Sequence, residues 1–216
     1  MSVPRADAKM DVKRNPDFRR AFTLIELLVV ITVIAILMAL LFPAFKGVQD
    51  QAKQTQAKND LTQIVTAVNA FYTEYGQYPI AFNAADLTLD GLNGNTNDAL
   101  FNILRAQEPT PAMNPKNIVF ISPPAVKDNN SPRSGISGAN GQYYDPWGTA
   151  YVIRVDTTYD NLVAPNPYKN NAGFTDNVNG GVIAWSFGKD QKSESVPGPA
   201  QDKKTGTNDD DVISWQ

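Results

Sequence analysis

The apolar residues of the chain are concentrated in one continuous run near the N-terminus. The run extends from Phe22 to Phe42, and Glu26 is its only charged residue. A helix rises 1.5 Å per residue, so about 20 apolar residues cross the hydrocarbon core of a bilayer. The pattern therefore predicts a transmembrane helix over residues 22–42.

A helical period continues beyond this run, but on one face only. The apolar side chains recur at the three- and four-residue spacing of an amphipathic helix: Leu61, Ile64, Val65, Val68, Phe71, Tyr72 and Tyr75. Gly76 and Pro79 are stop signals. We expect one long helix over residues 22–78, roughly 80 Å if unbroken, with Pro43 and Gly47 as its weakest points.

The remainder, residues 79–216, reads as a globular domain with short strands. Tyr151–Val155 alternates as a strand does, and Gly180–Gly188 is a second apolar strand. The two are expected to pair antiparallel across a long loop at residues 157–179. The predicted fold class is α+β, with the long N-terminal helix packed against a small antiparallel β-sheet that carries long loops.

Three shorter segments complete the expected domain. Leu100–Gln107 predicts a short amphipathic helix, and Asp145–Gly148 fits a type I turn with Asp, Pro and Gly at its first, second and fourth positions. The Asn-, Gly- and Ser-rich residues 127–141 favour a mobile loop.

Composition and charge narrow the possible functions. The chain has no cysteine and no histidine, which excludes disulfides, thiol catalysis, histidine-dependent triads and imidazole-bound zinc. Residues 1–21 carry six basic residues and three aspartates, a net charge of +3; the whole chain carries −3, so the rest carries −6. A basic flank stays in the cytoplasm by the positive-inside rule, so the part of the chain after the apolar run is expected to be exported. That acidic part has no basic stripe and is not expected to bind nucleic acid.

Two ordinary explanations of the N-terminal segment leave features unexplained. A secretory signal has an apolar core of roughly 7–15 residues and a small-residue cleavage site, whereas this core is longer and "LLFPAFK" is a poor site. A simple membrane anchor accounts for the run but not for Glu26, because a charged carboxylate at mid-bilayer costs about 2.5–3.5 kcal/mol.

The stretch "RRAFTLIELLVVI" resembles the prepilin processing site of the type IV pilin and type II secretion pseudopilin superfamily. The resemblance implies a basic leader, residues 1–21, cleaved between Ala21 and Phe22, and methylation of the new N-terminus at Phe22. It also implies that Glu26 pairs with the terminal ammonium of a neighbouring subunit during assembly. Pro43 falls where the family places a helix-kinking proline. The chain departs from the family at Ala21, where glycine is usual.

The C-terminal segment contains three successive carboxylates, Asp209 to Asp211, before "VISW". They do not form an EF-hand, which requires alternating oxygen ligands, a central glycine and a terminal glutamate. From the residues alone a solvated acidic turn is the simpler interpretation.

The segments "DPWGTAYVI", "SFGKD" and "DDDVISW" together resemble the C-terminal half of major type II secretion pseudopilins, which hold calcium in this region. The resemblance implies calcium as cofactor, held by the Phe187 and Asn208 carbonyls and by carboxylates of Asp190, Asp210 and Asp211. Asp209 and Asp202 are the substitutes if the register differs, because residues 191–207 are longer than the family's loop.

The resemblance implies a structural role without catalysis. The chain would be cut by a prepilin peptidase and would polymerise with itself and with minor pseudopilins on an inner-membrane assembly platform. It would cross the inner membrane once, with its C-terminal domain in the periplasm, and form a pseudopilus for type II protein secretion. One alternative is a type IV pilin of a surface pilus, serving adhesion, motility or DNA uptake. A membrane-tethered enzyme using Asp145, Asp190 and Asp210 is another alternative.

Overall fold

A computed structural model describes residues 22–81, 85–90, 95–107, 113–168, 177–192 and 208–215, apart from the side chains of residues 42–44. The chain divides into two compact units, Met1–Lys46 and Gly47–Gln216. The predicted leader, residues 1–21, lies outside the described residues. The boundary between the units falls at Gly47, so the C-terminal half of the long helix belongs to the globular unit.

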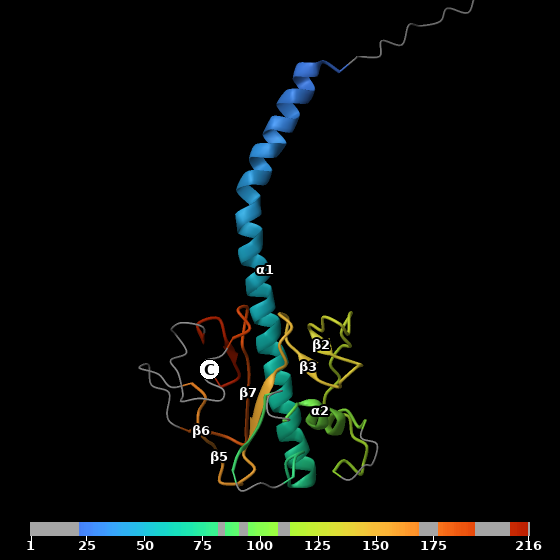
Figure 1. Ribbon diagram of the computed structural model, residues 1–216, viewed down its shortest axis with the longest axis vertical. Helices are drawn as coiled ribbons and strands as arrows, with labels where there is room; N and C mark the ends of the chain where they lie inside the picture. The colour runs from blue at the N-terminus through green and yellow to red at the C-terminus, as the bar shows by residue number, and fades with distance from the viewer. Residues whose placement is uncertain are drawn as a thin grey trace, which may run out of the picture. The chain divides into compact units, whose positions relative to one another are not determined.

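The long helix α1 runs from Leu24 to Tyr75 (Figure 1). It ends where the sequence predicts a stop: Gly76 has a left-handed backbone (φ 69°), and its N–H donates to the Tyr72 carbonyl at 2.8 Å. This is a helix end that glycine adopts without strain. The backbone continues in helical form through residue 43, so the described helix has no break at the predicted weak point.

The first unit contains the apolar half of α1, and its side chains are exposed. Among the described residues, α1 is the one helix whose length and composition suit a membrane span, and none of the side chains in its apolar window is buried. Exposed aliphatic side chains in such number are unfavourable in water. This part of the chain is therefore membrane-anchored or covered by other apolar surfaces.

The globular unit is built on a four-stranded antiparallel sheet. Its strand order is β1 (Leu87–Leu89), β4 (Val152–Val155), β7 (Val182–Ser186) and β8 (Val212–Ile213). The pairing of β4 with β7 confirms the expected antiparallel partnership, with Val152 opposite Trp185 and Val155 opposite Val182. The predicted α+β fold, a long helix with a small antiparallel sheet, is confirmed.

Both faces of the sheet are covered. Ile153, Val155 and Ala184 share a buried cluster with Leu61, Ile64 and Phe71 of α1. Val152, Ile183 and Trp185 point to the other face, where they pack with Val163 and Tyr168. Successive side chains of a strand alternate between faces, so β7, which is buried along its whole length, contributes to two separate cores.

Segments expected to be loops contain further pairing. Residues 157–179 include β5 (Leu162–Val163) and β6 (Val178–Asn179), which pair with each other. The expectation of a loop over residues 127–141 was wrong at two residues: β2 (Gly135–Ile136) pairs with β3 (Tyr143–Tyr144). Two-residue strands have no readable period, so their formation depends on tertiary contacts. The helix α2 (Asp98–Leu104) ends three residues before the predicted Gln107.

A buried carboxylate joins α1 to the sheet domain. Asp60 is 8% exposed and accepts a hydrogen bond from the Tyr151 hydroxyl at 2.8 Å. Burial raises the pKa of Asp60, and the Tyr151 hydrogen bond opposes this only in part. A carboxyl whose pKa is raised by folding stabilises the folded chain below its unfolded value, about 3.9, and loses this contribution as pH rises through the folded value.

We predict the pH dependence of an Asp60→Asn variant from this sign. The unfolding free energy of the variant relative to the native chain should increase as pH rises from about 4 to about 7, because only the native chain must ionise a buried carboxyl. Denaturant unfolding of both chains across this pH range measures the difference. A constant difference would show that Asp60 does not titrate in this way.

Candidate functional site

The N-terminus of α1 is closed by a reciprocal pair of side chains. The Thr23 backbone N–H and hydroxyl donate to Glu26 Oε2 at 2.9 and 2.7 Å, and the Glu26 backbone N–H donates to the Thr23 hydroxyl at 3.3 Å. This is a capping box, in which Ser or Thr and a Glu three residues later satisfy amides that the helix leaves without partners. The Thr-x-x-Glu spacing is the sequence signal for this capping box, which was not among the features predicted from the sequence.

The capping box gives Glu26 a role within its own chain. An apolar environment makes amides without hydrogen-bond partners costly, so the cap stabilises the helix start. The positive end of the helix dipole also stabilises the Glu26 carboxylate. The predicted cleavage residue Phe22 precedes the cap and is 77% exposed. Its neighbour Ala21 lies outside the described residues.

We predict that Thr23→Val shortens the helix at its start. Losing a Thr cap costs about 1 kcal/mol, so the first-turn amides should exchange faster with solvent in detergent micelles. Thr32→Val is the matched control, because the Thr32 hydroxyl donates to the Leu28 carbonyl within the same helix at 2.7 Å and caps nothing. Equal amide exchange in the two variants would contradict the capping role.

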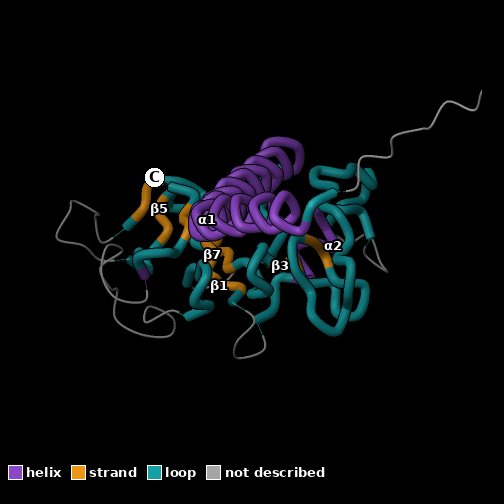
Figure 2. Tube along the Cα trace, turned by 90° about the horizontal axis from the view of Figure 1, so that it is seen from above, coloured by secondary structure: helices purple, strands orange, loops and turns teal. Residues whose placement is uncertain are grey.

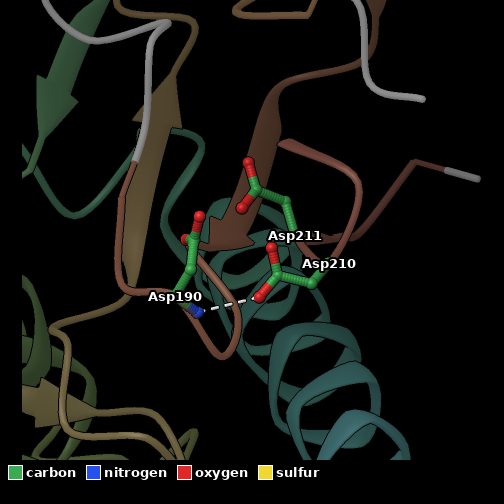
Figure 3. A group of neighbouring side chains, drawn as sticks. All are labelled: Asp190, Asp210 and Asp211. Atoms are coloured by element: carbon green, nitrogen blue, oxygen red, sulfur yellow. Dashed lines mark hydrogen bonds between the residues drawn. The ribbon is translucent and has the colours of Figure 1, made fainter. Parts of the chain in front are cut away.

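The second feature is a cluster of three carboxylates, Asp190, Asp210 and Asp211. One oxygen from each lies within 4.8 Å of the others, and the side chains converge on one point beside α1 (Figure 3). The Asp190 N–H donates to Asp210 Oδ2 at 2.9 Å. Asp190 is exposed, Asp210 half-buried and Asp211 buried.

Strand register brings these residues together. In the β7–β8 pair, Ser186 lies opposite Val212, so the residues just after β7 face those just before β8. Asp190 follows in the turn after β7, and Asp210 and Asp211 immediately precede β8. Two segments about 20 residues apart in sequence thereby meet at one end of the sheet.

Gly188 allows the two segments to approach closely. Its backbone is left-handed (φ 65°), and a Cβ there would lie 2.3 Å from the Asp210 carbonyl oxygen. Both the backbone conformation and the space require glycine. The sequence gives Gly188 no special status, because the close contact depends on strand pairing.

Neighbouring groups fix the cluster on both sides. The buried Tyr168 hydroxyl donates to Asp211 Oδ2 at 2.5 Å, and the low-dielectric site and the carboxylate raise the pKa of Tyr168. Lys189 forms an ion pair with Asp50 of α1 at 2.6 Å, and the carboxylate raises the pKa of Lys189. Lys189, which precedes Asp190, is therefore paired with Asp50 of the helix.

The turn at Asp145 supports the same end of the sheet. The Asp145 carboxylate accepts N–H groups of Trp147, Gly148 and Thr149 at 2.7–2.9 Å. It also accepts the Ser186 hydroxyl at 2.6 Å. The Gly148 N–H donates to the Asp145 carbonyl at 3.3 Å, which closes the predicted turn. The Asp145 carboxylate therefore has a structural role.

Of the other predicted ligands, Phe187 and Asn208 would contribute carbonyl oxygens, and they lie in the same two segments as the cluster. Phe187 precedes Gly188 and is 7% exposed, and the Asn208 carbonyl accepts the Asp211 N–H at 3.4 Å. Asp209 does not belong to the three-carboxylate group. Asp202 lies outside the described residues.

The motif and the fold are similar to those of type IV pilin-like proteins. Residues 18–42 match the family described as the prokaryotic N-terminal methylation motif. Over 69 residues the chain is 41% identical to the type IV major pilin protein PilA of Myxococcus xanthus, covering 32% of this chain and 31% of that pilin.

The chain is also a homologue of type II secretion system core protein G. It is 35% identical over 74 residues to that protein of Pseudomonas aeruginosa, covering 34% of this chain and 52% of the relative. For Escherichia coli the values are 32% over 66 residues, 31% and 46%. The chain thus matches 31–52% of the length of these curated relatives. No solved structure gives a significant match.

Proposed function

We propose that this chain is a structural subunit of a periplasmic pseudopilus in type II protein secretion. The observation that carries the proposal is the methylation motif at residues 18–42, placed at the start of a helix whose apolar side chains are exposed. Such a helix requires lipid before assembly and apolar partners after it. The similarity to core protein G supports the same function.

In this proposal a prepilin peptidase removes residues 1–21 and Phe22 becomes the methylated N-terminus. Glu26 then has two roles. Its Oε2 accepts the hydrogen bonds from the Thr23 N–H and hydroxyl, and its Oε1 accepts a hydrogen bond from the Phe22 ammonium of a neighbouring subunit. Opposite charges in a low-dielectric environment attract strongly, and such a pair sets the register between subunits.

We further propose that Asp190, Asp210 and Asp211 bind calcium, with Phe187 and Asn208 carbonyls as additional ligands. Calcium takes 6–8 oxygen ligands at about 2.3–2.6 Å, so carboxylate oxygens within 4.8 Å of one another can contact a single ion. Two unit charges 4 Å apart near a protein surface repel by about 4 kcal/mol. A divalent cation would offset this repulsion and clip the C-terminal strand to the turn after β7.

The proposed partners follow from assembly rather than from catalysis. The chain would contact other copies of itself, minor pseudopilins and the assembly platform of the inner membrane. It would span that membrane once through α1 and place the unit from Gly47 onwards in the periplasm. No catalytic residue is assigned.

The mass of the mature N-terminus tests the proposal. Co-expression with an active prepilin peptidase should yield a chain that begins at Phe22 and carries one methyl group. A catalytically inactive peptidase is the control and should leave residues 1–21 attached. A chain that stays intact beside the active peptidase, or is cut after residue 42, would overturn the proposal.

The surface-pilus alternative has one observation in its favour, the 41% identity to a type IV major pilin. That match covers 31% of the pilin, whereas the Pseudomonas core protein G is covered to 52%. The matched lengths, 69 and 74 residues, are similar, and it is the two separate matches to core protein G that favour the pseudopilus. N-terminal processing is common to both interpretations and does not separate them.

A further inference from the structure

The globular unit presents two grooves of opposite charge, one on each side of the exposed face of α1. The acidic groove, about 590 Å³, lies between helix residues 54–62 and residues 209–213. The basic groove, about 520 Å³, lies between Gln56 and residues 124–134. Both grooves border the same two turns of the helix.

Helical geometry separates the grooves. At 3.6 residues per turn, each residue is rotated by about 100° from the one before it. The helix residues that line the acidic groove therefore have a mean angular position about 130° around the helix axis from Gln56. The buried positions Ala57, Leu61 and Ile64 face the sheet, so the arc between the grooves faces solvent. The views along and across the helix agree: β5 lies on one side of α1 and β3 on the other (Figures 1 and 2).

The charges of the two grooves are complementary. Asp209, exposed, and Asp210, half-buried, line the acidic groove. Lys58 also lines it, but its ammonium donates to the Ile213 carbonyl at 2.7 Å. Lys127 and Arg133, both exposed, line the basic groove with one carboxylate, Asp128.

The two cations of the basic groove have no carboxylate partner within the described part of the chain. The ion pairs found there are Lys116–Glu74 and Lys189–Asp50. Asp128 accepts the Asn130 N–H at 2.9 Å. In a chain of net charge −3, two unpaired cations in one groove favour an acidic partner surface.

The exposed side chain of Arg133 starts beside the turn that contains Gly148. A Cβ at Gly148 would lie 3.4 Å from Arg133 Cγ and 3.5 Å from its Nε, so the arginine stem lies along the turn that contains Gly148. The adjacent Ser134 N–H donates to the Asp145 carbonyl at 2.8 Å. The backbone that carries Arg133 is therefore anchored to the turn at Asp145.

We propose that the surface around the basic groove of one copy of this chain contacts the surface around the acidic groove of a second copy, so that Lys127 and Arg133 face Asp209, the carboxylate of the acidic groove that lies outside the proposed calcium cluster. The proposal rests on the proposed function, in which the chain polymerises. The two surfaces differ, so the contact is heterologous and propagates into a filament instead of closing a dimer. Charge complementarity of this kind fixes register and excludes wrong pairings.

Cysteine cross-linking tests the contact, because the native chain contains no cysteine. Asn59→Cys lies in the acidic groove and Ser131→Cys in the basic groove, and both sites are exposed. The pair leaves every charge in place. In membranes of cells with an active prepilin peptidase, oxidation of the double variant should give a ladder of dimers and higher multimers.

The controls separate this contact from chance collisions. Neither single variant can build a ladder through one heterologous contact. Asn59→Cys with Val119→Cys, which is 58% exposed and lies outside both grooves, should give none either. Arg133→Asp should reduce the multimers about tenfold or more, because like charges then face each other. Asp209→Arg added to Arg133→Asp should restore them.

Electron microscopy of the same cells distinguishes the two claims. Filaments without a ladder would overturn this contact and leave the proposed function standing. If the native chain formed no filaments, both the proposed function and this inference would be contradicted. A loss in Arg133→Asp that Asp209→Arg does not restore would mean that the basic groove serves a different partner, which also overturns the proposal.

Discussion

Calcium at 100 times its dissociation constant should raise the melting temperature of the full-length chain in detergent by about 5–10 °C. A ligand bound only by the folded state contributes about 2.7 kcal/mol at that concentration, and 1 kcal/mol shifts the melting temperature of a chain of this size by about 2–4 °C. Asp210→Asn with Asp211→Asn should abolish the shift, because two of the three converging carboxylates are lost.

Two controls sharpen this result. Asp209→Asn removes a carboxylate from the same turn but not from the cluster, so it should keep the calcium response. Magnesium should stabilise less, because it requires a smaller octahedral site. An equal calcium shift in the double variant would show that the ion binds elsewhere, and no shift in the native chain would leave the cluster a solvated turn.

Gly188→Ala should destabilise the chain by roughly 2 kcal/mol more than Gly76→Ala. Both glycines have left-handed backbones, at φ 65° and 69°, so both variants bear similar backbone strain, on the order of 1 kcal/mol. Only at Gly188 does the added Cβ meet backbone, 2.3 Å from the Asp210 carbonyl oxygen; nothing lies within 4 Å at Gly76. The excess is the cost of separating the two segments.

Denaturant unfolding of the two variants measures this difference. The Gly188 variant should also respond less to calcium, since Asp210 must move. If both variants lose the same stability and respond equally to calcium, the close approach of Gly188 to Asp210 is not important for the cluster.

Sequence patterns predicted the parts of the fold that rest on long periods. The apolar run and the one-sided stripe around Leu61 and Phe71 predict α1, the strand around Ile153 alternates, and the strand around Ile183 is a short apolar run. The stop at Gly76 is also local, because glycine adopts the left-handed conformation there. These features are set by residues close to one another in the chain.

Features that depend on distant contacts escaped prediction. β2 and β5 have two residues each, too few for a period, and the second core around Trp185 forms only when Tyr168 folds back onto the sheet. For the candidate site, the family resemblance supplied Asp190, Asp210 and Asp211. It did not supply Gly188 or the Tyr168 hydrogen bond, because both depend on how β7 meets β8.

Deleting the gene for this chain and measuring both the secreted proteins and the surface pili of the cells tests the central claim most directly. The account predicts that folded exported proteins disappear from the medium and accumulate in the periplasm, while surface pili persist. The native chain should restore secretion, and a Glu26→Ala chain should not. Loss of surface pili with secretion unchanged would contradict the pseudopilus assignment and favour a type IV pilin.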